Sequence, residues 1–155
     1  MSNSTFNVKA VLAGLVVGIL GGVITALPFA IALGRAFSPE SLMISDISSL
    51  TVGGVINRCW NAAPVMCSLG VFLAVFFSVA QGYVTAAFAP GAEKKNVWWL
   101  AVLMVLLSIV PALLESSVAV LGMSSMELLT LGGIAVLLLL ATMLGGVLRE
   151  WQIRT

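Results

Sequence analysis

Four long apolar stretches separated by short polar segments are the strongest pattern in the chain. Each stretch is long enough to cross a bilayer core of about 30 Å, which takes roughly 20 helical residues. Inside lipid the backbone must satisfy its own hydrogen bonds, so each crossing is expected to be helical. The sequence therefore predicts an all-α integral membrane protein, a bundle of four transmembrane helices over residues 10–34, 62–89, 97–121 and 127–148.

Basic residues near the ends of these stretches set the expected direction of the chain, because cytoplasmic loops are enriched in Lys and Arg. Four crossings place both termini and the 90–96 loop on one side, which holds Lys9, Lys94, Lys95, Arg149 and Arg154. The other side holds Arg35 and Arg58. Tryptophans beside the larger basic group are typical of an aromatic belt. We therefore expect a bacterial inner (plasma) membrane protein with both termini in the cytoplasm.

The longest polar segment, residues 35–61, is expected to lie on the outer side. A Ser-Pro-Glu triplet starting at Ser38 is typical of a helix start, with a capping serine and a proline in the first turn. Apolar residues then recur on one face, which predicts a short amphipathic helix over 39–50 on the membrane surface. Pro64 is expected to kink the helical segment over 55–89 and to leave Asn57 to Asn61 at the outer interface.

Small residues recur at every fourth position of the first stretch, from Ala10 to Gly34. Such rows let membrane helices approach closely, as in a glycine zipper. Residues four apart drift by about 40° per step around a helix, so the row faces more than one neighbour in turn. The expected contact joins the small residues of the first two stretches: Gly14, Gly18 and Gly22 against Gly70, Ala74, Ser78 and Gly82.

Composition narrows the class of function. The 155 residues are 61% hydrophobic and 8% charged, with a net charge of +1 and no histidine. A soluble domain averages about a quarter charged residues, and a nucleic-acid partner would call for a basic surface. Without histidine, the usual haem ligand and the usual general base at neutral pH are missing. We expect one membrane domain over residues 1–155 and assign no catalytic residues.

Glu115 is the main candidate for chemistry, because its position predicts a carboxyl inside the hydrocarbon, about 24 Å from the inner edge of its helix. Acids inside membranes are rare and usually functional. Glu115 shares a polar stripe with Ser108 and Ser116, which is typical of a proton or cation site. The alternative is a structural acid, protonated or bonded to neighbouring hydroxyls or to an arginine of another subunit.

A second candidate combines polar, cationic and aromatic groups just before Pro64: Asn57, Arg58, Trp60 and Asn61. The pattern is typical of an interface anchor, with the tryptophan in the aromatic belt and the arginine on a lipid phosphate. It also fits an outer pocket for a lipid headgroup or a quinone. Bound lipid or quinone is accordingly the one small-molecule partner that the sequence suggests, and no cofactor is predicted.

Sulfur residues gather toward the outer side and form a third candidate. Soft thiolate and thioether ligands suit Cu(I), and the candidate ligands are Cys59, Cys67, Met123 and Met126. On one straight helix the two cysteines would be about 12 Å apart along the axis. A disulfide needs Cα atoms within about 7 Å, so the cysteines are expected to stay unpaired unless the helix breaks between them.

A resemblance covers less than half of the chain. Gly14, Gly18, Pro28 and the stretch from Asn57 to Asn61 resemble the small four-span proteins related to anthrone oxygenases. The last two apolar stretches do not share this resemblance, and no function is carried over from it.

The residues favour a small non-catalytic membrane protein, a subunit or assembly partner of a larger membrane complex that packs through small-residue helix faces. Its expected partners are membrane lipids and other membrane subunits or further copies of the chain, with no nucleic acid. The first alternative is a small proton- or cation-coupled transporter or channel that uses Glu115. The second is a membrane enzyme or a lipid- or quinone-binding protein with an outer pocket.

Overall fold

The computed structural model describes residues 6–37, 52–115 and 125–155, with side chains at 6–37, 56–107 and 132–155. Within these residues there are five helices and no strands. The helices are α1 (Val8–Ala36), α3 (Val52–Ala62), α4 (Pro64–Ala87), α5 (Glu93–Glu115) and α6 (Ser125–Arg154). The all-α prediction is confirmed, whereas the predicted surface helix over 39–50 lies outside the described residues.

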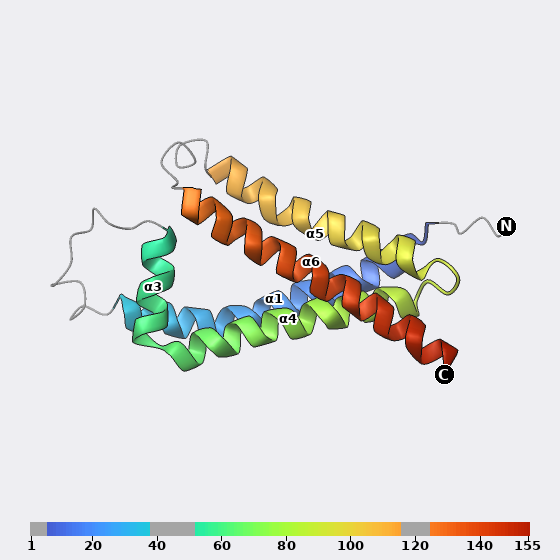
Figure 1. Ribbon diagram of the computed structural model, residues 1–155, viewed down its shortest axis with the longest axis horizontal. Helices are drawn as coiled ribbons and strands as arrows, with labels where there is room; N and C mark the ends of the chain where they lie inside the picture. The colour runs from blue at the N-terminus through green and yellow to red at the C-terminus, as the bar shows by residue number, and fades with distance from the viewer. Residues whose placement is uncertain (1–5, 38–51, 116–124) are drawn as a thin grey trace.

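The four long helices lie along one another, with α1 beside α4 and α6 crossing α4 (Figure 1). Both termini and the α4–α5 connection lie at one end of the molecule, and α3 lies at the opposite end (Figure 1). A shared end for the two termini agrees with the predicted topology. The side of a membrane that this end faces stays a prediction.

Three described helical segments are long and apolar enough to cross a membrane: Val8–Ala36, Pro64–Ala87 and Gly132–Arg154. Their outward apolar side chains include Phe72 and Leu140, which are both more than half exposed. Such exposure suits contact with lipid tails, and the class of membrane protein follows from it. α5 covers much of the predicted crossing at 97–121, and the fourth crossing stays a prediction.

α3 and α4 separate at Ala63, as Pro64 predicts. The backbone continues to hydrogen-bond through this corner, since Ala63 N–H donates to the Cys59 carbonyl at 2.9 Å and Cys67 N–H donates to the Ala63 carbonyl at 3.1 Å. Pro64 begins α4, a position where its missing N–H leaves no helical hydrogen bond unmade. α3 therefore runs across the ends of α1 and α4 instead of extending α4 (Figure 1).

A tight turn reverses the chain between α4 and α5. Ala92 N–H donates to the Ala89 carbonyl at 3.0 Å, and Pro90 and Gly91 occupy the two central positions. Gly91 has a φ of 81°. Proline followed by a residue of positive φ is typical of a type II turn, which favours glycine at that place.

Candidate functional site

α1 packs on α4 through glycines that leave no room for a side chain. A Cβ added to Gly14 would stand 2.8 Å from Leu100 Cδ2 and 3.0 Å from the Gln81 carbonyl oxygen. A Cβ added to Gly21 would stand 2.5 Å from the Cβ of Phe77. Both positions therefore need glycine if the helices are to stay at this separation, the kind of close approach on which membrane helix packing depends.

Gly14, Gly18 and Gly21 lie on the face of α1 that packs against the bundle, and Gly22 lies outside this face. Gly22 is exposed, and a Cβ added there would meet nothing within 4 Å. The predicted contact of Gly22 with α4 is wrong within this chain. The reason is helical geometry, because seven positions return to within about 20° of the starting direction, whereas eight positions turn through about 80°.

The small residues of α4 are divided between two neighbours. Gly70 faces α1, and a Cβ there would stand 2.7 Å from Phe29 Cε2. Ala74 is half-buried, and the buried Ser78 donates its hydroxyl proton to the Ala74 carbonyl at 2.7 Å. Gly82 faces α6 instead of α1. Gly70 therefore packs against Phe29 of α1 and not against the predicted glycines, and the predicted contact with α1 is wrong at Gly82.

α4 and α6 cross with their backbones in contact. A Cβ added to Gly82 would overlap the Thr142 carbonyl oxygen and stand 2.9 Å from the carbonyl carbon. A Cβ added to Gly145 would overlap the Val79 carbonyl oxygen and stand 2.7 Å from the Tyr83 nitrogen. Each helix thus presents a glycine to the backbone of the other, a geometry that favours dispersion and Cα–H···O contacts.

Gln81 joins three helices at this crossing. Its side chain is 3% exposed, and its Nε2 donates to the Thr142 hydroxyl at 3.0 Å. That hydroxyl donates in turn to the Leu138 carbonyl at 2.9 Å. Gln81 Oε1 lies against Gly18 of α1 and has no hydrogen-bond partner. The Gln81 amide therefore hydrogen-bonds α4 to α6 and makes a close contact with α1.

Gln81→Leu should lower the free energy of unfolding by about 1 kcal/mol, within the range for hydrogen bonds between membrane helices. Thr142→Val removes the same bond and should have a similar effect. Unfolding by SDS in mixed detergent micelles measures both. Because the two residues share one bond, the double variant should lose little more than either single variant. Fully additive losses would show that the bond does not contribute.

The corner between α3 and α4 buries both cysteines. Cys59 and Cys67 are free thiols, 7% and 1% exposed, and they pack in one cluster with Ala32, Ala36 and Ala63. Burial raises the pKa of the Cys59 thiol, and the neighbouring Cys67 raises this pKa further. The break at Ala63 thus brings together two thiols that a straight helix would hold about 12 Å apart.

The polar residues of α3 divide between the surface and the end of α1. Asn57, Trp60 and Asn61 are exposed, and Asn61 Nδ2 donates to Asn57 Oδ1 at 3.5 Å. The half-buried Arg58 places its guanidinium carbon 5.9 Å from the ring centre of Phe37, a cation–π distance. The interface anchor and the headgroup or quinone pocket both stay predictions.

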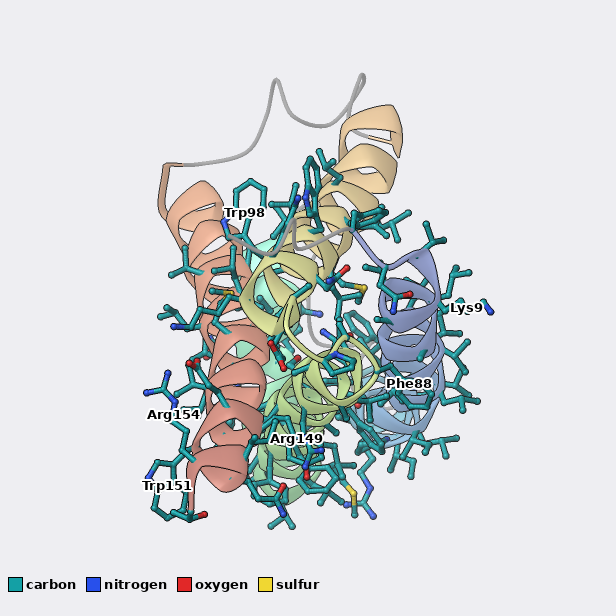
Figure 2. The ribbon with its side chains drawn as sticks, turned by 90° about the vertical axis from the view of Figure 1, so that its right-hand side faces the viewer. Lys9, Phe88, Trp98, Arg149, Trp151 and Arg154 are labelled. Atoms are coloured by element: carbon teal, nitrogen blue, oxygen red, sulfur yellow. The ribbon has the colours of Figure 1, made fainter. Side chains whose placement is uncertain are left out.

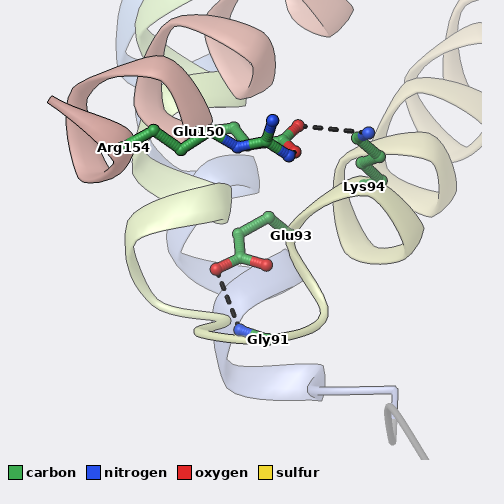
Figure 3. A network of polar contacts seen from close by, with 5 residues as sticks. All are labelled: Gly91, Glu93, Lys94, Glu150 and Arg154. Atoms are coloured by element: carbon green, nitrogen blue, oxygen red, sulfur yellow. Dashed lines mark hydrogen bonds and ion pairs between the residues drawn. The ribbon is translucent and has the colours of Figure 1, made fainter. Parts of the chain in front are cut away.

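Charged groups meet at the other end of the molecule. Glu150 of α6 pairs with Lys94 at 3.2 Å and with Arg154 at 2.6 Å (Figure 3). Gly91 N–H donates to the Glu93 carboxylate at 2.8 Å (Figure 3). Because the Lys94 side chain is 77% exposed, its ion pair contributes little stability, at most about 1 kcal/mol.

Basic and aromatic side chains surround this end. Lys9, Trp151 and Arg154 point outward from the bundle in the end-on view of Figure 2. Trp98 and Trp99 are exposed, and their rings meet edge to face with centres 5.4 Å apart. A rim of this composition is typical of a membrane–water interface.

A buried asparagine closes the same end. Asn96 is 0% exposed, its Oδ1 accepts from Asn7 N–H at 2.8 Å, and its Nδ2 donates to the Ala92 carbonyl at 2.8 Å. Asn7 in turn caps α1 through Ala10 N–H and donates to the Phe88 carbonyl at 3.0 Å. The start of α1 is therefore tied to the α4–α5 turn.

Sequence reasoning missed Gln81, Thr142 and Asn96, although a signal was present. Gln81 and Thr142 are polar residues beside small ones, Gly82 and Ala141, within apolar stretches. A polar side chain next to a close-packing position in lipid is expected to find its partner on the neighbouring helix.

Five predicted site residues have side chains outside the described ones: Ser108, Glu115, Ser116, Met123 and Met126. The described backbone of α5 ends at Glu115. The proton or cation site and the two methionine ligands therefore stay predictions.

Comparisons with protein-family models, with curated proteins and with solved structures found no match to this chain. Its function is therefore inferred from its own geometry.

Proposed function

We propose that the protein is a small non-catalytic membrane subunit that packs against a further transmembrane helix through α1. One observation carries this proposal, namely the exposed second half of the small-residue row. Gly22, Ala26, Ala30 and Gly34 are all exposed and lie about one helical turn apart. The first half of the same row contains Gly14, which packs closely on α4.

Gly22 and Gly34 make no close contact with another helix in the described part of the chain. Among the described residues, a Cβ at Gly22 or Gly34 would meet nothing within 4 Å, and glycine in a helix costs about 1 kcal/mol relative to alanine. Covering one apolar surface with another gains little in lipid, so close backbone approach is what favours association. A partner helix that crosses α1 at a right-handed angle would follow the drift of the row.

The test replaces Ala26 and Ala30 together by leucine. Both side chains are exposed, so the monomer should fold normally, while the partner helix meets added bulk that costs about 1–3 kcal/mol. The fraction of protein in a complex, measured by cross-linking in membranes and by native mass in mild detergent, should fall roughly tenfold or more.

The matched control is Ile24→Phe, which adds bulk to an exposed position about 160° around α1 from Ala26. It should leave the complex intact. Two results would overturn the proposal: a wild-type protein that runs as a bare monomer after cross-linking, or a leucine variant that keeps its partner. Mass spectrometry of the retained complex distinguishes a second copy from a different subunit.

A further inference from the structure

The α3–α4 corner brings sulfur atoms together in a small buried cluster. Cys59 comes from α3 and Cys67 from α4, and both belong to one buried cluster with Ala32, Ala36 and Ala63. The alanine side chains are apolar, so the two thiols are the polar groups of this cluster. The break at Ala63 is what makes the approach possible, since it falls midway between the two cysteines.

A third sulfur residue lies at the same place. Met66 is partly buried and packs against the cluster that contains Cys59 and Cys67. Two thiols and a thioether are soft donors, which select Cu(I) over harder cations. Among the described residues, no group of three or more His, Cys, Asp or Glu is placed to hold a metal ion. The described donors are therefore unlike the four-ligand sets of structural zinc.

We propose that Cys59, Met66 and Cys67 form a binding site for one Cu(I) ion at the α3–α4 corner. Binding replaces the proton on each thiol with a copper–sulfur bond, and the two protons pass to water. Copper stays monovalent, so the step needs no oxidant or reductant. The site with two thiolates and one Cu(I) ion then has a net charge of −1. The site rests on the geometry of the corner and is independent of the function proposed for α1.

A positive group lies beside the cluster. Arg58 precedes Cys59 in α3, and its guanidinium stacks on Phe37, which packs against the same buried residues. The guanidinium is a planar, positively charged group. It would offset the negative charge of a copper dithiolate at the edge of the apolar cluster, where an uncompensated charge is costly.

The experiment titrates the purified full-length protein with Cu(I) under anaerobic conditions, against bicinchoninate as a competing chromophoric chelator. One copper per chain is expected. Even outer-shell changes alter metal affinity by about 10–100-fold, so Cys59→Ser and Cys67→Ser should each weaken binding by more than about 100-fold. Met66→Leu should weaken it less, and Met143→Leu on α6 is the matched control that leaves it unchanged.

Copper X-ray absorption on the wild-type protein provides a test that does not depend on how the variants fold. Only sulfur neighbours should be seen, and nitrogen or oxygen ligands would overturn the proposal. Affinity that survives in the double Cys59→Ser, Cys67→Ser variant would also overturn it. So would a wild-type protein that, when purified anaerobically with both thiols reduced, takes up no copper.

Discussion

Gly82→Ala should lower the free energy of unfolding by about 3 kcal/mol, a large effect for a single methyl group. The added Cβ would overlap the Thr142 carbonyl oxygen. That oxygen belongs to the backbone of α6, so it cannot rotate away as a side-chain atom can. Relief requires α4 and α6 to separate, which also weakens the contact of Gly145 with Val79. Overpacking of this kind costs about 1–3 kcal/mol or more.

The control for Gly82 is Gly133→Ala on α6. A Cβ at Gly133 would meet nothing within 4 Å, so this variant should be as stable as the wild type or about 1 kcal/mol more stable through helix propensity. SDS-driven unfolding in mixed micelles, followed by helical circular dichroism, compares the two. Equal stabilities for the two alanine variants would rule out the close α4–α6 crossing.

Local backbone features of the structure can be predicted from the sequence. Pro64 predicts a kink, and the structure has two helices, α3 and α4, that separate one residue before it. The Pro90-Gly91 pair lies in a tight turn of the type that this pair favours. Both features depend on the dihedral angles of one or two residues, so no knowledge of the tertiary structure is needed to foresee them.

Helix partners were harder to predict from the same residues. A row of small residues shows that close packing is possible, but it does not say which neighbour uses each position. Gly22 and Gly82 illustrate the problem, since the first is exposed and the second packs on α6. The drift of about 40° per step makes the assignment sensitive to a single residue.

The candidate copper site illustrates the same limit. Cys59 and Cys67 are far apart on a straight helix, and only the direction in which the chain turns at Ala63 decides whether they meet on the inside of the corner. Met66 is one of the sulfur residues on the outer side, but it was not among the four candidate copper ligands. Its packing against the cluster that contains Cys59 and Cys67 is visible only in the structure.

Asn96→Leu should lower the free energy of unfolding by about 2 kcal/mol. Leucine has the same branching and the same number of side-chain heavy atoms as asparagine but makes no hydrogen bonds, so Asn7 N–H at the start of α1 loses its acceptor and the Ala92 carbonyl loses one donor. Leaving a buried donor unpaired costs about 1–3 kcal/mol. The loss should be local as well as global, because the Asn7 amide holds the first turn of α1 to the α4–α5 connection. Hydrogen exchange of the peptide that contains Asn7 should therefore become faster.

Asn61→Leu on α3 is the matched control, because it makes the same change at an exposed asparagine whose amide, among the described residues, donates to Asn57 at 3.5 Å. It should change the free energy of unfolding by less than about 0.5 kcal/mol, with no effect on exchange at Asn7. If Asn96→Leu left the exchange of Asn7 unchanged, the buried amide would fill space without holding α1. If it accelerated exchange there while α6 stayed protected, the N-terminal turn of α1 would open separately from the α4–α6 crossing. The hydrogen bonds around Asn96 and those around Gln81 would then belong to units that open independently.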